Sequence, residues 1–203
     1  TVVATKFKGV VSAYEIWNEP DLPEYQFGYM DGTPEHYVDM LREAYNIIKS
    51  IDPTAIVVGG AIGDPLRNED FAIRIFELGA ADYMDVHSVH LYRYDNWSFN
   101  YGDFIRWAKE LSGKPIWVTE TGEVTGKAPA WIQPAPDRTE EMQAEYMRRR
   151  FNEMINSEVK PDVILWYLFY DWEDVEEKWG VVTSDYTPKL AYYEFKKFAL
   201  GQP

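Results

Sequence analysis

The sequence contains no cysteine among its 203 residues, which excludes disulfide bonds and catalysis by a thiolate. It also has no long uninterrupted apolar run, so we expect no segment that spans a membrane. Basic residues are few, since 20 Lys and Arg stand against 34 Asp and Glu, and the formal net charge is −14. Nucleic acid and anionic membranes are therefore not expected as partners, because both require a positive surface.

The N-terminal residues 1–7 lack the charged start and long apolar middle of a signal peptide, and the compartment stays open. A length of 203 residues is enough for one domain with a sizeable core, and we treat residues 1–203 as a single domain. Aromatic residues make up 16% of the chain, with eight Trp and fifteen Tyr. Such a content suits either stacking on sugar rings or the packing of strands against helices.

Strand-like and helix-like patterns alternate along the chain, which predicts an α/β fold with about five parallel strand–helix units. The expected strands are 10–17, 55–60, 86–91, 116–119 and 163–169. The expected helices are the tail of one over 1–9, then 33–52, 71–78, 104–111, 137–155 and 188–200. Asp137 and Glu140 have the spacing of a capping box at the start of one of these helices.

One apolar run ends on the carboxylate of Glu19, and the next residue is Pro20. Proline has no N–H to donate to a sheet, so the strand is expected to stop there, with Glu19 at its carboxyl end. By the alternation of a strand, Glu19 shares a face with Trp17, while Asn18 points off beside it. The carboxyl ends of barrel strands are where enzymes of that fold place their chemistry.

A second apolar strand ends on Glu120, and Gly122 then releases the chain into a loop. Glu19 and Glu120 thus occupy the same structural position on strands that are three apart in sequence order. Glycoside cleavage with retention needs two carboxyl groups, roughly 5–5.5 Å apart. The alternative is that both are solvated acids at the edges of loops.

The residues Trp17-Asn18-Glu19-Pro20 resemble the acid/base motif of the clan A glycoside hydrolases, and Thr119-Glu120-Thr121-Gly122 resembles their nucleophile motif. The resemblance implies a (β/α)8 barrel fold, with Glu19 as acid/base and Glu120 as nucleophile. In that register the strands of this chain are strands 4–8 of the barrel. The segment 179–189 is also similar to the one that follows the last strand in families 5 and 39.

Further site residues follow from the same resemblance. His90 and Tyr92 are similar to the clan's sixth strand, where the Tyr holds the nucleophile and the His lines the sugar subsite. Asn18 would bind the sugar 2-hydroxyl, with Trp17 beside it in the substrate site. Trp166 or Trp172 would supply the aromatic floor of the subsite, and Trp166 is preferred.

We expect no metal and no cofactor. Glu19, His87, His90 and Glu120 have the right residue types for ligands, but no His-x-x-x-His pair is present. His87 has the opposite strand alternation to His90 and is expected to be structural. Glu15, deeper along the strand of Glu19, is also expected to be structural, and the acidic run 171–177 is interpreted as a solvated loop rim or, less simply, a cation site.

The sequence thus predicts a partial (β/α) barrel whose function is the retaining hydrolysis of O-glycosidic bonds, with β linkage implied by the resemblance. The alternative is a carbohydrate-binding or partner-dependent barrel fragment with little activity alone. Five units leave two open sheet edges, for which three explanations stand: a longer protein, pairing with another copy, or local repacking. Homo-oligomerisation through the open edge is the working hypothesis. The sugar, and exo or endo action, stay open.

Overall fold

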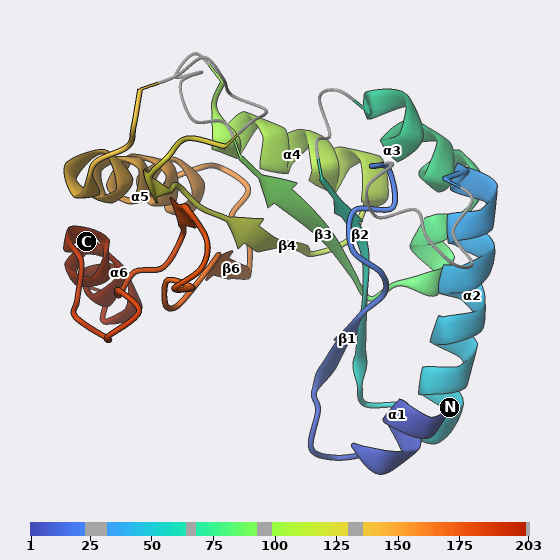
Figure 1. The fold of residues 1–203 in the computed structure, drawn as a ribbon. Helices are drawn as coiled ribbons and strands as arrows, with labels where there is room; N and C mark the ends of the chain where they lie inside the picture. Colours follow the sequence, from blue (N-terminus) through green and yellow to red (C-terminus); the bar gives the residue numbers. More distant parts are fainter. Residues whose placement is uncertain (23–31, 64–67, 93–98, 130–135, 202–203) are drawn as a thin grey trace. The chain divides into compact units, whose positions relative to one another are not determined.

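The computed structural model of the protein describes residues 1–22, 32–63, 68–92, 99–129 and 136–201. Helices and strands alternate along these residues (Figure 1). The helices are α1 (Val2–Lys6), α2 (Pro34–Ile51), α3 (Glu69–Glu77), the 3-10 helix η2 (Ala80–Tyr83), α4 (Tyr101–Ser112), α5 (Glu140–Ile155) and α6 (Leu190–Ala199). The strands are β1 (Ala13–Glu15), β2 (Ile56–Ile62), β3 (Val86–Leu91), β4 (Ile116–Thr121), β5 (Thr125–Gly126), β6 (Val163–Trp166) and β7 (Glu177–Lys178). Within the described ranges, no helix is both long and apolar enough to cross a lipid bilayer.

Five strands form one sheet in the order β1-β2-β3-β4-β6, and the short strands β5 and β7 pair antiparallel. The pairs β1–β2 and β2–β3 are parallel. Within this five-stranded sheet each strand therefore lies beside the sheet strand that precedes it in the chain, as in a (β/α) barrel, whereas a doubly wound sheet reverses its order partway. The predicted fold class, a partial barrel of about five parallel strand–helix units, is confirmed.

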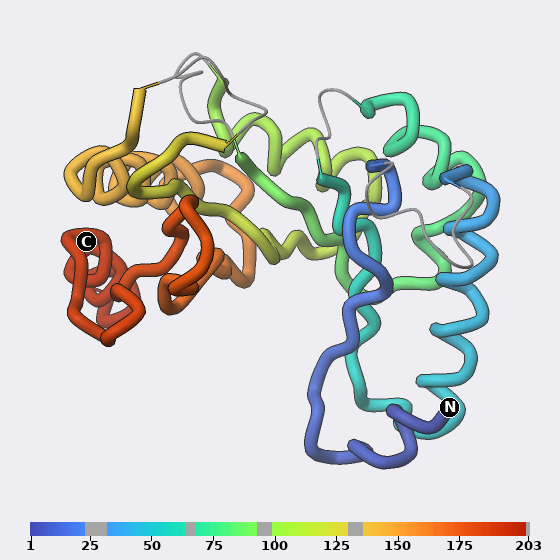
Figure 2. The backbone as a smooth tube through the Cα atoms, in the orientation of Figure 1, coloured from blue at the N-terminus to red at the C-terminus, as the bar shows by residue number. Residues whose placement is uncertain are grey.

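The chain forms two compact units. The first consists of Thr1–His90, Ile105–Thr119 and Pro161–Val163, and the second of Leu91–Phe104, Glu120–Lys160 and Ile164–Pro203. In the first unit the backbone passes from α1 through a wide loop into β1 (Figure 2).

The core of the first unit lies between β2 and the helices α2 and α3. Helix α2 is capped by Thr33, whose Oγ1 accepts the His36 N–H at 3.2 Å. Its apolar stripe includes Tyr37 and Leu41, which are fully buried, and Val57 of β2 is buried opposite them. Each buried side chain of the size of Leu contributes about 1.5–3 kcal/mol relative to exposure.

In the second unit α5 and α6 pack on each other through Phe151 and Phe198, whose ring centroids are 5.1 Å apart. The guanidinium of Arg150 is buried against the ring of Tyr101, 4.3 Å from its centroid, and lies 5.8 Å from that of Tyr146. A cation held over aromatic faces regains part of the interaction it loses with water. Arg150 thereby joins α5 to the start of α4.

A buried ion pair fixes the segment that follows β6. Lys189 Nζ lies 3.1 Å from Asp171 Oδ1 and 3.1 Å from Thr125 Oγ1. Asp171 Oδ1 also accepts the Gly180 N–H at 2.8 Å. Burial lowers the pKa of Lys189, and the negative charge of Asp171 opposes that shift. The Gly180–Asp171 hydrogen bond joins the two ends of the segment 171–180, and Lys189 neutralises the carboxylate that accepts it.

Two of the predicted strands are too long. Residues 10–17 were expected as a strand, but β1 covers Ala13–Glu15. The last strand, expected over 163–169, ends at Trp166. Beyond it the backbone bonds to another segment of the same unit, since the Leu168 N–H donates to the Trp179 carbonyl at 3.3 Å.

Two helix starts also differ from the prediction. The cap of α5 is Thr139, whose Oγ1 accepts the Met142 N–H at 3.3 Å, so the capping box expected from Asp137 and Glu140 is wrong. The helix itself is confirmed through Ile155. Helix α6 begins at Leu190, two residues later than expected.

Candidate active site

Glu19 lies beyond the end of β1, on a segment with strained backbone. Trp17 and Glu19 have φ angles of 68° and 46°. The Glu19 N–H donates to the carbonyl of Ala61 at 3.0 Å, and Ala61 itself has a φ of 46°. A left-handed φ costs residues other than glycine about 1–3 kcal/mol each, and such strain concentrates at functional sites. The prediction that strand alternation places Trp17 and Glu19 on one face is therefore wrong.

The carboxylate of Glu19 is buried against β3. Its Oε1 lies 2.8 Å from Nδ1 of His90, which is also buried. Gly63, just after β2, makes room for it, because a Cβ there would lie 2.7 Å from Glu19 Cδ. The structure thus brings together Glu19 and His90, both predicted as site residues.

Glu120 belongs to the second unit and lies within β4, one residue before its end. It is half-exposed, and its Oε2 accepts a hydrogen bond of 2.9 Å from the hydroxyl of Tyr92. A phenol that donates to a carboxylate stabilises its ionised form and fixes its orientation. The expected contact between Tyr92 and Glu120 is present in the structure.

Trp179 is a candidate that sequence reasoning missed as a site residue. Its indole ring lies edge-on to Tyr92, with centroids 5.6 Å apart, and edge-on to Tyr167 at 5.7 Å. Gly122 leaves space for this group, because a Cβ there would lie 3.3 Å from a Trp179 ring carbon. The sequence signal was weak, since more than eighty residues separate Tyr92 from Trp179.

The two tryptophans considered for the sugar floor lie in different environments. The ring of Trp166 packs against Tyr146 and Phe151 of α5, with centroids 6.2 Å away in both cases, and its N–H donates to the Trp179 carbonyl. Trp166 therefore faces the helix layer. Trp172 is 47% exposed in the segment after β6 and is available for stacking.

Trp17 and Asn18 are half-exposed on the segment that carries Glu19. Glu15 is exposed and accepts a hydrogen bond of 2.8 Å from the hydroxyl of Thr119. That contact ties β1 to β4 within the first unit, and the structural role of Glu15 stays a prediction.

His87 lies on the opposite face of β3 from His90. It is fully buried, with Nδ1 3.3 Å from the Ala108 carbonyl and its ring edge-on to Phe76 at 4.8 Å. Burial lowers the pKa of His87 from 6.5 to about 4, so the ring is neutral at physiological pH. Of the four residues considered as metal ligands, His87 thus turns away from Glu19 and His90.

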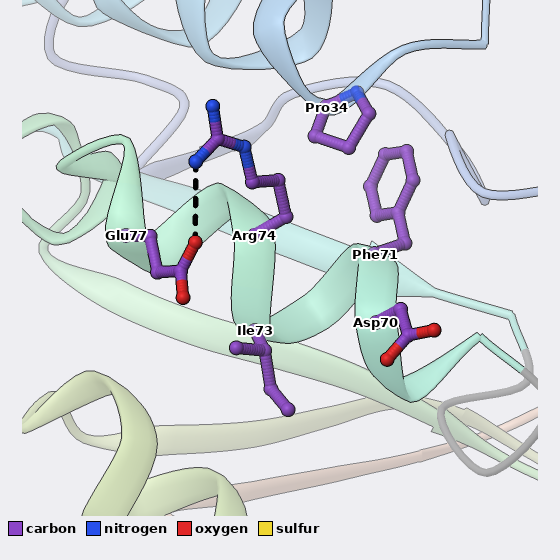
Figure 3. A pocket seen from close by; sticks show the side chains of 6 residues that line it. All are labelled: Pro34, Asp70, Phe71, Ile73, Arg74 and Glu77. Atoms are coloured by element: carbon purple, nitrogen blue, oxygen red, sulfur yellow. Dashed lines mark hydrogen bonds and ion pairs between the residues drawn. The ribbon is translucent and has the colours of Figure 1, made fainter.

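A shallow depression in the first unit lies apart from these residues (Figure 3). Two of its charged residues are paired, since Arg74 lies 3.2 Å from Glu77, and Arg74 also lies 2.8 Å from Glu35. None of the predicted site residues lines it; the lining residues are Pro34, Asp70, Phe71, Ile73, Arg74 and Glu77. It offers no chemistry comparable to that of Glu19 and Glu120.

The sequence profile of the family described as "Glycosyl hydrolase catalytic core" matches residues 13–193. The chain belongs to this family. A search with this chain found no significant match among curated proteins.

Solved structures similar to this glycosyl hydrolase core include a family 39 glycoside hydrolase from Bacteroides cellulosilyticus WH2, with a TM-score of 0.70 and 21% identity over 94% of this chain and 41% of that one. A family 39 β-xylosidase from Caulobacter crescentus has a TM-score of 0.65 and 17% identity over 92% of this chain and 41% of that one. Xylanase 10B from Thermotoga maritima has a TM-score of 0.67 and 20% identity over 99% of this chain and 64% of that one. The chain therefore spans about two fifths to two thirds of the length of these structures, and the likeness establishes the fold.

Proposed function

We propose that the protein is a retaining β-glycosidase in which Glu120 is the nucleophile and Glu19 the acid/base. The observation that carries this proposal is that the two glutamates have chemically different partners. Glu120 accepts a hydrogen bond from the hydroxyl of Tyr92, whereas Glu19 contacts an imidazole nitrogen of His90. Two carboxyl groups in different environments are how one site performs nucleophilic and acid–base chemistry together.

In this mechanism Glu120 attacks the anomeric carbon and forms a covalent glycosyl–enzyme intermediate. The Tyr92 hydroxyl keeps the attacking oxygen charged and aimed before the reaction. Water then hydrolyses the intermediate, and two successive inversions give net retention at the anomeric carbon.

Glu19 donates a proton to the departing oxygen in the first step and removes one from water in the second. The imidazole of His90 suits this exchange, because its Nδ1 is a donor in one tautomer and an acceptor in the other. It can therefore hydrogen-bond to Glu19 in both protonation states of the carboxyl group. Asn18, half-exposed on the same segment, is proposed to bind the sugar 2-hydroxyl.

We propose a neutral β-linked sugar as substrate, with β-xylosides as the first candidates. Two of the similar structures are a β-xylosidase and a xylanase. A formal net charge of −14 disfavours anionic saccharides by long-range repulsion. Trp172 and Trp179 supply aromatic surface on which a sugar ring can stack.

The test is hydrolysis of p-nitrophenyl β-D-xyloside by the chain, with the anomeric form of the first product followed by NMR. We expect the β-anomer first, and Glu120→Gln should lower the rate roughly a thousandfold or more. Glu15→Gln is the matched control and should keep the wild-type rate. An α-anomer as first product, or an active Glu120→Gln variant, would refute the proposal.

A second candidate is a saccharide-binding barrel fragment that hydrolyses its substrate only in an assembly, such as a homo-oligomer. The exposure of Leu165 (50%) on β6, an end strand of the sheet, and of Phe169 (61%) after it favours this candidate. Binding of xylooligosaccharides without hydrolysis by a species with the mass of one chain, and hydrolysis only by a species that light scattering shows to be heavier, would support it. Hydrolysis by a species with the mass of one chain would exclude it.

A further inference from the structure

Asp21 follows Glu19 by two residues, and its carboxylate is buried at 8% exposure. Oδ1 accepts the N–H of Gly63 at 2.9 Å, and Oδ2 accepts a hydrogen bond of 2.8 Å from the side-chain amide of Asn68. Gly63 lies directly after β2 and Asn68 immediately before α3. One carboxylate thus joins the Glu19 segment to both ends of the β2–α3 connection.

A carboxylate suits this position because both of its oxygens accept and both partners donate. An isolated buried charge is costly, so its hydrogen bonds must be made in the folded protein. Asp21 therefore holds the segment at a defined distance from Gly63. The side chain of Glu19 lies against the backbone of this same residue, Gly63.

Backbone hydrogen bonds also hold this segment. The Glu19 N–H donates to Ala61 at 3.0 Å, and the Leu22 N–H donates to the Glu19 carbonyl at 3.1 Å. A glutamate disfavours the positive φ that Glu19 adopts, so contacts with other parts of the chain must maintain this conformation. Asp21 supplies side-chain contacts that reach 42 and 47 residues along the chain.

We propose that Asp21 is a positioning residue for the acid/base carboxyl group of Glu19. This inference rests on the proposed function for the role of Glu19. Asp21 does not touch substrate, and it acts by holding the Glu19 carboxyl group where it can protonate the departing oxygen. Its loss should therefore harm the step that needs an acid more than the step that does not.

The experiment compares Asp21→Ala with Asp52→Ala on two substrates, phenyl β-D-xyloside and dinitrophenyl β-D-xyloside. The oxygen of the departing phenol needs a proton from an acid, whereas dinitrophenol departs as a stable anion without one. Asp52 is the matched control, since it is also a buried anchor, accepting hydrogen bonds from Thr54 and Gly9 at the other end of β2.

For Asp21→Ala we expect kcat/KM, which reports formation of the glycosyl–enzyme, to fall roughly a hundredfold on the phenyl substrate and about threefold or less on the dinitrophenyl substrate. Asp52→Ala should change both rates by the same factor. The swapped pair Asp21→Asn with Asn68→Asp restores an amide-to-carboxylate contact and should recover the phenyl rate. Equal losses on both substrates for Asp21→Ala, or no recovery in the swapped pair, would overturn the inference.

Hydrogen exchange of the segment 17–22 gives a readout that does not need activity. Asp21→Ala should speed exchange there, and Asp52→Ala should not. If the wild-type chain hydrolyses neither substrate while exchange rises as expected, the positioning role stands and the proposed function fails. If hydrolysis depends on Glu120 but neither the substrate ratio nor exchange responds to Asp21→Ala, the positioning role fails and the proposed function stands.

Discussion

The two glutamates at the carboxyl ends of the strands are held in opposite ways. Glu120 lies within the regular strand β4 and has a phenol as partner. Glu19 lies four residues past β1, at a left-handed φ, and has an imidazole as partner. The same residue type is thus placed once by strand geometry and once by side-chain and backbone contacts from distant parts of the chain.

Residue type and strand position therefore do not by themselves assign a catalytic role to a glutamate. A hydroxyl donor favours the charged carboxylate that a nucleophile requires. An imidazole can give or accept a proton, as the partner of an acid/base group must. The acid/base side also carries the backbone strain, at Trp17, Glu19 and Ala61.

The largest expected effect is a pH-dependent loss of stability caused by His87, which lies on β3 on the face opposite His90. In the unfolded chain His87 takes up a proton near pH 6.5, but burial lowers its pKa to about 4 in the folded protein. Between these pH values the unfolded state holds more protons, so stability is full above pH 6.5 and falls as the pH decreases towards 4. The loss should amount to about 3 kcal/mol.

Denaturant unfolding between pH 4 and pH 7 measures this loss. His87→Gln keeps a donor for the Ala108 carbonyl but does not titrate, so its stability should be flatter over this range. A wild-type protein whose stability is the same at pH 7 and pH 4.5 would contradict the buried, neutral state of His87.

The next effect tests the nucleophile side. Tyr92→Phe removes the hydroxyl that donates to Glu120, and a hydrogen bond to a charged group contributes about 1.5–3 kcal/mol. We expect the rate to fall roughly 10–100-fold on phenyl and dinitrophenyl xylosides alike. Tyr14→Phe is the control, because the Tyr14 hydroxyl is buried without a hydrogen-bond partner in the described part of the chain. Equal activity of the Tyr92→Phe and wild-type proteins would be inconsistent with the account.

The smallest effect compares two glycines, one beside each glutamate. A Cβ on Gly63 would lie 2.7 Å from Glu19 Cδ, and one on Gly122 would lie 2.6 Å from the Tyr167 carbonyl oxygen. Gly63→Ala should lower kcat/KM roughly tenfold on the phenyl substrate and spare it on the dinitrophenyl one, whereas Gly122→Ala should lower it on both. Identical substrate ratios for the two variants would remove the distinction between the sides.

Much of the fold was predictable because it depends on local pattern. The apolar runs of β2 and β3 and the Thr33 cap of α2 are visible in the sequence, and the structure has them there. The contact of Tyr92 with Glu120 was expected from a resemblance and is present. What failed depended on distant partners, as with Glu19, whose backbone conformation is fixed by Ala61.

Asp21 and Trp179 were missed for the same reason. The two described partners of the Asp21 carboxylate, Gly63 and Asn68, lie 42 and 47 residues away in the sequence. Trp179 contacts Tyr92 through a segment held by the pair of Lys189 and Asp171. No periodicity reports such contacts, because they arise from packing after the strands have formed.

The most direct test of the unequal roles of the two glutamates is the rate of Glu19→Gln and Glu120→Gln on phenyl and dinitrophenyl β-D-xylosides. The account predicts that Glu120→Gln loses both activities, whereas Glu19→Gln loses the phenyl activity and retains formation of the glycosyl–enzyme from the dinitrophenyl substrate. Equal losses on both substrates in both variants, or the reverse assignment, would contradict it.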